Sequence, residues 1–528
     1  MTVSYPVEVE LKLALPRQQA TAFLRLMARR RSVPVRHAMR TLYFDTPDFA
    51  LSALGVALRV RRIGRRWLQT IKTEGERHGG LSQRAEFEMP VTRGMPDWNR
   101  FPAEALALVP EALRAQLEPV FETRFERTAW LIGGDGGASI EVALDVGEVH
   151  AGARRLPICE IELELKSGQQ DALFELAHGW AQRLDCLPFD VSKAERVVRL
   201  ARGQVVVPFK SVPLTLDSGM SVEAGFAAIV QACLDQFQAN LPGVLSPLPS
   251  PPPGAGEGAK AGPKPIDDIE YVHQARVSLR RLRAALRLYR KVCVLPAGLM
   301  DGLRSLAAAL GPARDWDVLC GETLPAIAPH YQNEAGWQQG AAVLEAHRVE
   351  VRAAMQAALR LARPGAWLLA FQRWLLQRGW RMSPSGGTVS EAQRFTQLSP
   401  LKKWARGSLQ KGHRPIARGA RVFAGLQPLQ RHALRIAIKR QRYAAEFFQT
   451  LLAGRRQAQY LDMLREAQDS LGRSNDARVA WELLKNAPVD TGPVGQFALG
   501  WLAAQQVQGP TEDIAGHLQG FVKFAPYW

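Results

Sequence analysis

The sequence is poor in cysteine and lacks the spacings that give cysteine a structural role. Its 528 residues include five cysteines, and no two of them form a CxxC pair. The five are Cys159, Cys186, Cys233, Cys293 and Cys320. We therefore expect neither a zinc cluster nor a disulfide framework. We expect an intracellular protein whose thiols are reduced.

Long apolar runs and nucleotide-binding loops are missing as well. No stretch of about 18 apolar residues occurs, so we expect no membrane-spanning helix and no membrane partner. The first residues, MTVSYPVEVELKL, lack the basic segment and apolar core of a signal peptide. No Walker A sequence is present, because the glycines of 254–258 lie in low-complexity sequence. The expected location is the cytoplasm.

The formal net charge of +18 is distributed unevenly along the chain. Residues 1–210 hold 30 Lys+Arg and 26 Asp+Glu, whereas residues 211–528 hold 38 and 24. Short alternating runs such as VEVELKLAL precede residue 210, and long Ala/Leu/Arg-rich segments with helical periodicity follow Thr215. We therefore expect a β-rich domain over residues 1–208, a basic all-helical domain over 213–528, and an anionic partner.

Several predicted strands carry one charged and one apolar face, because side chains two residues apart share a face. The charged faces are Glu8/Glu10/Lys12, Arg59/Arg61, Arg84/Glu86/Glu88, Glu141/Asp145 and Glu160/Glu162/Glu164/Lys166. One such strand alone would fit a sheet with its polar face in water. The set is sorted into acidic and basic strands, and helices predicted over 17–31, 103–117 and 169–184 can cover the apolar faces. This favours a closed antiparallel barrel with a charged lumen.

A lumen of this kind suits a polyanion that binds together with a metal ion. Carboxylates are oxygen ligands for Mg²⁺ or Mn²⁺. Arg and Lys side chains bind phosphate oxygens. Phosphoryl transfer needs mainly positioning and charge neutralisation, and no Ser/His/Asp arrangement is evident in the sequence. The sequence therefore predicts phosphoryl-transfer chemistry.

The order of these motifs resembles that of CYTH domains, the triphosphate tunnel metalloenzymes. Glu8-x-Glu10-x-Lys12 is similar to the ExExK signature of that family. The later motifs follow in order, within about residues 3–203, as Tyr43-Phe44-Asp45-Thr46-Pro47, Leu58-Arg59-Val60-Arg61, Gln69-Thr70-Ile71-Lys72, Arg84-x-Glu86-x-Glu88, Glu160-x-Glu162-x-Glu164-x-Lys166 and Ser192-Lys193-Ala194-Glu195-Arg196.

The resemblance implies an eight-stranded antiparallel tunnel with flanking helices that binds triphosphate and a divalent metal. Metal ligands would be Glu8, Glu10, Asp145, Glu162 and Glu164. Phosphate-binding residues would be Lys12, Arg59, Arg61, Lys72, Arg84, Arg127 and Lys193. The residues implied in catalysis are Glu8, Glu10 and Lys12. Arg124 is the alternative to Arg127, and Glu86 and Glu88 are either metal ligands or partners that orient the basic residues.

The second part contains a basic helix that occurs twice. In YVHQARVSLRRLRAALRLYRK, one helical stripe is formed by His273, Arg276, Arg280, Arg283, Arg287 and Arg290. The stripe returns 159 residues later as His432, Arg435, Lys439 and Arg442. Downstream, Leu310-Gly311-x-x-Arg314-Asp315 matches Leu471-Gly472-x-x-Asn475-Asp476. We therefore expect two duplicated helical bundles whose basic stripes face one anion-binding groove. The two histidines are either ligand contacts or hydrogen-bonding core residues.

These motifs resemble the CHAD domain, the conserved histidine α-helical domain, over about residues 215–528. The resemblance implies binding of inorganic polyphosphate by His273, Arg276, Arg280, Arg283, Arg287, His432, Arg435, Lys439 and Arg442. Residues 241–268 are rich in Pro, Gly, Ser and Ala and are expected to form a disordered insert within this domain.

The two resemblances together imply a bacterial CYTH–CHAD inorganic triphosphatase, which hydrolyses triphosphate to diphosphate and phosphate with Mg²⁺ or Mn²⁺. Association with polyphosphate granules is a further expectation. Three alternatives remain open: a thiamine or nucleoside triphosphatase, an adenylate cyclase-type tunnel enzyme, and a granule protein with a vestigial tunnel. Nucleic acid is not an expected partner, because aromatic residues do not interleave the basic stripes. The sequence predicts no oligomeric state.

Overall fold

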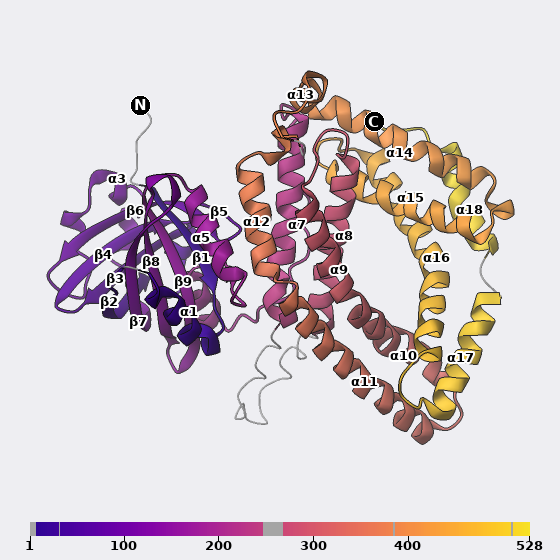
Figure 1. Cartoon of the computed structure of the whole chain (residues 1–528), viewed down its shortest axis with the longest axis horizontal. Helices are drawn as coiled ribbons and strands as arrows, with labels where there is room; N and C mark the ends of the chain where they lie inside the picture. Colours follow the sequence, from indigo (N-terminus) through magenta and orange to yellow (C-terminus); the bar gives the residue numbers. More distant parts are fainter. Residues whose placement is uncertain (1–6, 31, 246–267, 384–385, 508–510) are drawn as a thin grey trace. The chain divides into compact units, whose positions relative to one another are not determined.

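The computed structural model describes residues 7–30, 32–245, 268–383, 386–507 and 511–528. The chain divides into two compact units, which are coloured along the sequence in Figure 1. The barrel unit comprises Met1–Val207 and Arg363–Gln377. The helical unit comprises Pro208–Ala362 and Arg378–Trp528.

The barrel unit is built on an eight-stranded antiparallel barrel (Figure 1). Around the barrel the order is β1 (Val7–Ala14), β9 (Arg154–Ser167), β8 (Ser139–Ala151), β7 (Glu118–Gly133), β2 (Val35–Asp45), β3 (Val56–Ile63), β4 (Arg66–Thr73) and β6 (Leu81–Val91). Pairing of β1 with β6 closes the barrel, and the short strands β5 (Glu76–His78) and β10 (Leu187–Pro188) extend its sheet. The predicted closed antiparallel barrel is confirmed.

The alternation of β1 separates the core from the lumen. Leu11 and Leu13 are fully buried in a cluster with Phe23 of α1 (Ala20–Ala28) and Trp180 of α5 (Asp171–Ala181). Glu10 and Lys12 point the other way, into the lumen. Burial of the apolar face against helices therefore leaves the charged face inside the barrel.

Three helices predicted on the outside of the barrel are shorter than expected. Arg17–Gln19 is a 3₁₀ turn ahead of α1, and α5 spans 11 residues. The helix predicted over 103–117 is two single turns, α3 (Ala103–Leu106) and α4 (Glu111–Arg114). Pro110 separates them, because the residue before a proline is disfavoured in helical conformation. A further helix, α6 (Lys193–Ala201), begins after Ser192, whose hydroxyl accepts a hydrogen bond from the Glu195 amide.

The second segment of the barrel unit is the helix α12 (Pro364–Leu376), which packs on α5 and β10. Arg373 donates two hydrogen bonds to the Asp171 carboxylate, at 2.8 and 2.6 Å. A Cβ placed on Gly365 would lie 2.0 Å from the backbone oxygen of Cys186, so the helix approaches the chain at β10 closely. A segment that follows the first helices of the helical unit in sequence therefore completes the packing around α5.

The helical unit contains helices of 4 to 31 residues (Figure 1). Their bounds are α7 (Val222–Leu245), α8 (Asp268–Leu288), α9 (Ala297–Val318), α10 (Leu324–Ile327), α11 (Glu334–Leu361), α13 (Glu391–Leu398), α14 (Leu401–Arg421), α15 (Pro428–Phe447), α16 (Arg455–Lys485), α17 (Gly492–Val507) and α18 (Thr511–Lys523). Most of the insert predicted over 241–268 lies outside the described residues. Its first residues, 241–245, belong to α7, because Leu241 and Val244 are buried in spite of Pro242.

One pair of backbone hydrogen bonds in the helical unit is reciprocal between the two repeats. α8 and α9 contain the first copy of the repeated motifs, and α15 and α16 contain the second. At the start of α7, the Val222 amide donates to Ser399 O at 3.0 Å. At the start of α14, the Leu401 amide donates to Met220 O at 2.9 Å. This reciprocal pair of hydrogen bonds relates α7 to α14, as expected for a duplicated helical unit.

Candidate active site and paired basic stripes

A cavity of about 940 Å³ occupies the barrel. Eleven of the predicted site residues line it: Glu8, Glu10, Lys12, Arg59, Arg61, Lys72, Arg84, Arg127, Glu162, Glu164 and Lys193. Asp145 is fully buried behind the lining. The barrel therefore brings together side chains that are as far apart in sequence as Glu8 and Lys193.

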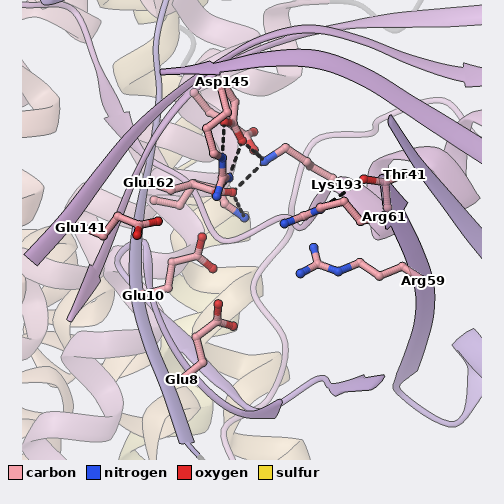
Figure 2. A network of polar contacts seen from close by, with 12 residues as sticks. Glu8, Glu10, Thr41, Arg59, Arg61, Glu141, Asp145, Glu162 and Lys193 are labelled. Atoms are coloured by element: carbon pink, nitrogen blue, oxygen red, sulfur yellow. Dashed lines mark hydrogen bonds and ion pairs between the residues drawn. The ribbon is translucent and has the colours of Figure 1, made fainter. Parts of the chain in front are cut away.

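A group of carboxylates, the acidic wall, lies across the cavity from two arginines. Figure 2 shows the carboxylates of Glu8, Glu10 and Glu162 directed toward the guanidinium groups of Arg59 and Arg61. The acidic wall comes from β1 and β9, which pair with each other, and the two arginines come from β3. The acidic strands β1 and β9 and the basic strand β3, which the sequence distinguished by charge, thus face each other across the cavity.

One row of the acidic wall consists of three carboxylates on neighbouring strands. Glu10 is directly opposite Glu164, and Glu164 is directly opposite Glu141. Like charges directly opposite each other destabilise a sheet. Lys166 offsets part of this repulsion, with its Nζ 2.6 Å from Glu164 and 3.9 Å from Glu141. Burial, and then the charge of Glu162, raise the pKa of Glu10 above its usual value.

The donor set of this wall fits a divalent metal ion. Carboxylate oxygens are the ligands that Mg²⁺ and Mn²⁺ prefer. A cation beside Glu10 would relieve the repulsion that raises its pKa. Glu8 already has basic neighbours, since Lys72 Nζ and Arg84 Nε both lie 2.8 Å from its carboxylate. Against the effect of burial, these two cations hold the pKa of Glu8 well below its usual range.

Asp145 holds two of the basic residues in place. Arg127 donates to both of its oxygens at 2.7 Å, and Lys193 Nζ donates at 2.7 Å. Although burial favours the protonated acid, these two cations keep the pKa of Asp145 below its usual value. In this structure the carboxylate that was predicted as a metal ligand is therefore saturated by basic partners.

A second acidic cluster surrounds the same lysine. Asp145, Glu160 and Glu162 lie close enough together to hold a metal ion. Lys193 Nζ contacts all three carboxylates, at 2.7 Å for Glu162. Arg196, one turn further along α6, also contacts Glu160. The cluster therefore fixes the start of α6 against the barrel through an ammonium group.

Arg59 and Arg61 are cations whose hydrogen-bonding groups the protein satisfies only in part, although Glu86 pairs with Arg59 at 3.3 Å. Both are at least 91 % buried. In the described part of the chain, the one polar side-chain contact of Arg61 is with Thr41 Oγ1 at 3.3 Å, and Arg59 Nε has no hydrogen-bond partner. Burial, and then the charges of Arg59 and Arg127, lower the pKa of Arg61 to about 10. A buried anion would satisfy both groups.

The geometry distinguishes residues that the sequence left as alternatives. Arg127 lines the cavity, whereas Arg124 pairs with Glu122 on the outside and its side chain is 59 % exposed. Glu86 lies 2.9 Å from Lys72 Nζ and 3.3 Å from Arg59, which is the geometry of an orienting partner. Glu88 also lines the cavity, 3.3 Å from the Thr70 hydroxyl.

The sequence assigned no role to several side chains of the cavity and its surroundings. They are Thr41, Tyr43, Glu141 and Glu160. Tyr43 is in a recognised motif, and its phenol is buried beside Arg59, Arg61 and Lys193, which lower its pKa against the effect of burial. Glu141 and Glu160 could have been found, because each continues an acidic alternation on its strand.

The two basic stripes of the helical unit lie near each other. Their helices α8 and α15 are in contact. Burial, and then the charges of Arg435 and Arg280, lower the pKa of Lys439 to about 8. Because Arg280 belongs to α8 and Lys439 to α15, cations of the two repeats lie within range of each other's charge. Burial, and then the charges of Arg287 and Arg290, likewise lower the pKa of Arg440 of α15.

The individual stripe residues differ in their surroundings. Arg283 and Arg287 are exposed, as is His432. His273 is half-buried, and burial followed by the charge of Arg314 lowers its pKa. Arg442 donates to Gln468 at 2.9 Å and to Glu446 at 2.5 Å.

Of the helices that are described, none combines the length and apolarity needed to cross a bilayer.

Comparisons with known proteins place two families on the two units. Residues 7–198 match the CYTH domain and residues 228–485 match the CHAD domain. The inorganic triphosphatase of Haemophilus influenzae is 33% identical over 192 residues, which are 36% of this chain and 53% of that protein. The chain thus spans about half the length of that curated relative.

Two solved structures resemble parts of the chain. The CHAD domain from the plant Ricinus communis is 30% identical and matches 60% of this chain and 98% of its own, with a TM-score of 0.47. HpAC1 from Hippeastrum, for which a dominant triphosphatase activity is described, is 16% identical. It matches 38% of this chain and 97% of its own, with a TM-score of 0.28.

Proposed function

Because this chain is a CYTH domain followed by a CHAD domain, we propose that it hydrolyses inorganic triphosphate to diphosphate and phosphate in the barrel and binds inorganic polyphosphate on the helical unit. The observation that carries the first part is the pair Arg59 and Arg61. Two buried guanidinium groups with unfilled hydrogen-bonding capacity face a carboxylate wall across one cavity. A phosphate chain with a metal ion complements both walls at once.

The acidic wall would hold the metal through Glu8, Glu10, Glu162 and Glu164, with Asp145 behind them. Bound there, Mg²⁺ or Mn²⁺ supplies charge neutralisation of the phosphates and an activated water for in-line attack. The chain itself supplies the positions. Arg59, Arg61 and Lys193 bind phosphate oxygens, and Asp145 holds Arg127 and Lys193 toward the cavity.

Lys12 and the remaining cations complete the binding of the phosphate chain. Lys12 Nζ lies 3.7 Å from Glu162, so it sits where the acidic and basic groups meet. Lys72 and Arg84 bridge Glu8 and its neighbours and neutralise them in the free protein. Both side chains also line the cavity, where they can contact phosphate oxygens as well as these carboxylates.

One end of the cavity also favours an organic triphosphate as the second candidate substrate. Apolar side chains line this end, where β2, β3 and β7 lie side by side. Val33, Val35 and Leu131 are 86%, 52% and 61% exposed. Exposed apolar side chains at a cavity mouth can cover the organic group of a nucleotide or of thiamine triphosphate.

A substrate panel distinguishes the two candidates. Phosphate release from inorganic triphosphate, ATP and thiamine triphosphate is measured with Mg²⁺, with Mn²⁺ and with EDTA. We expect inorganic triphosphate to have the highest kcat/KM and EDTA to abolish release, because carboxylates alone repel the substrate. Comparable turnover of ATP would overturn the inorganic assignment, and full activity in EDTA would overturn the metal requirement.

Polyphosphate binding to the helical unit should depend on pH through Lys439. Its pKa of about 8 in the free protein should rise when a polyanion binds, since the ammonium form is favoured. Affinity is therefore full below pH 8 and falls above it, by at most about tenfold per pH unit because one proton is taken up. The measurement is the dissociation constant of long-chain polyphosphate at pH 7, 8 and 9 and constant ionic strength.

The matched control is Lys439→Arg, which keeps the positive charge across this range. It should remove most of the loss of affinity above pH 8. An equal loss in wild type and Lys439→Arg would show that another group, or the polyphosphate itself, is responsible.

A further inference from the structure

The repeated Leu-Gly-x-x-Arg/Asn-Asp motif of the helical unit has no role in the function proposed above. Its last residue is an aspartate in both copies, which is Asp315 on α9 and Asp476 on α16. We propose that these two aspartates are built-in counter-ions of the basic stripes. Asp315 pairs with Arg276, Asp476 offsets the charge of Arg435, and both are displaced when polyphosphate binds. This inference rests on the proposed polyphosphate binding and concerns its selectivity.

The first repeat shows the pairing directly. Arg276 of α8 has its Nη2 3.5 Å from Asp315 Oδ1 of α9, with the two side chains 22% and 40% exposed. A Cβ placed on Gly311 would lie 3.2 Å from Arg276 Nη1. The glycine therefore leaves room for the guanidinium to lie along α9 and reach the aspartate one turn further on. In this repeat, the glycine and the aspartate of the motif therefore both serve the position of Arg276.

The second repeat has the same elements. Asp476 is exposed on α16, and its Oδ2 would lie 3.9 Å from a Cβ placed on Gly472. Burial lowers the pKa of Arg435, and the charge of Asp476 is the principal opposing effect. The equivalent aspartate thus acts on the equivalent arginine.

The two aspartates also act on each other. Burial raises the pKa of Asp315, Arg276 and Arg314 oppose this, and the charge of Asp476 adds to it. The two carboxylates are therefore near enough to act on each other, as the contact between α9 and α16 requires. A cluster of four or more cations without internal acids would repel itself strongly in the free protein.

The geometry of the pairing suits displacement. At 3.5 Å, with partly exposed side chains, an isolated ion pair of this kind contributes little stability. Asp317, two residues further along α9, is different. It is 99% buried, and Arg348 donates to it at 2.9 Å. The end of α9 thus contains two different aspartates. Asp315 can be displaced from its arginine, whereas Asp317 is fixed in the core.

The consequence is selectivity for long phosphate chains. A single phosphate that enters must replace one carboxylate and gains one or two contacts, so little net attraction remains. A chain that spans both stripes replaces two carboxylates and meets the cations of both repeats through one covalent molecule. Its later contacts form at high effective concentration, so they more than offset the displaced pairs.

The test uses Asp315→Asn, Asp476→Asn and their combination in the full chain. Binding of long-chain polyphosphate and of inorganic phosphate is measured by calorimetry at low and high salt. We expect each single variant to bind polyphosphate about two- to fivefold more tightly at low salt, the range of one exposed ion pair. The double variant should bind more tightly still, and inorganic phosphate should gain proportionally more than the chain.

The charge-matched control is Asp462→Asn, which removes an exposed acid of α16 that pairs with Arg465 at 2.8 Å. It should leave polyphosphate affinity unchanged. Weaker or unaltered binding in both Asp315→Asn and Asp476→Asn would overturn the inference, as would equal tightening in Asp462→Asn. Asp476 is exposed, so its variant remains informative if Asp315→Asn folds poorly.

Failure of this inference and failure of the proposed function give different results. If wild type does not bind polyphosphate, the proposed function of the helical unit is wrong. If wild type binds and Arg276→Ala weakens binding, but the asparagine variants do not strengthen it, only the counter-ion role is wrong.

Discussion

Replacing Glu10 with glutamine should abolish triphosphate hydrolysis while sparing polyphosphate binding. Glu10 is 95% buried in the acidic wall, and Arg84 lies 2.6 Å from its carboxylate. Glutamine has the same shape but no charge, so the wall loses a proposed metal ligand. We expect kcat to fall by at least about 10²-fold, the effect of removing one charge-stabilising group from a preorganised site. Phosphate release and polyphosphate calorimetry measure the two activities on one preparation.

Stability separates a chemical effect from unfolding in this variant. The pKa of Glu10 is raised, so the folded protein holds the ionised form at a cost. Glutamine removes that cost but also the ion pair with Arg84, which keeps its pair with Glu8 at 2.8 Å, so the thermal midpoint should change little. Glu148→Gln is the matched control, because Glu148 is an acid of β8 with 44% side-chain exposure outside the cavity lining. Unimpaired turnover in Glu10→Gln would remove Glu10 from the site.

Replacing Arg276 and Arg435 together with alanine should have the opposite pattern. These are equivalent residues of the two stripes, and each is half-buried with its pKa lowered by burial. Loss of two charge-assisted contacts should weaken polyphosphate binding by about 10²-fold at low salt, and less at high salt. Triphosphate hydrolysis should be unaffected, since neither residue belongs to the barrel unit.

The helix α14 supplies a control of equal charge for this pair. Residues 401–421 contain seven Lys and Arg and no acid, and Lys411 and Arg414 are exposed. Lys411→Ala with Arg414→Ala removes the same two charges from the same unit. If this pair weakens polyphosphate binding as much as the stripe pair does, net charge and not the stripes determines affinity.

The barrel could be predicted because its sequence satisfies two requirements at once. Leu11 and Leu13 need an apolar cover and Glu10 and Lys12 need a polar lumen, and only one orientation of β1 meets both needs. The strand alternation therefore determines which side chains line the cavity. The duplicated basic stripe could also be predicted from the sequence, because a helix places residues three and four apart on one face.

Partners within the site could not be predicted from spacing. The sequence left Glu86 as either ligand or orienting residue, and its contacts with Lys72 and Arg59 depend on the meeting of β3, β4 and β6. The pairing of Asp145 with Lys193 likewise depends on where α6 begins. The break at Pro110 is a different case. The proline itself signals the break, but the helical periodicity of residues 103–117 led us to predict one continuous helix.

The helix α12 has a consequence for the order in which the protein is made. The eight strands are complete by residue 167, but the helix that packs on α5 does not begin until Pro364. During synthesis on the ribosome, the barrel unit therefore lacks part of its packing until much of the helical unit has been translated. A gene fragment that stops after residue 207 would encode every strand and every cavity residue, yet leave the α5 surface without its covering helix.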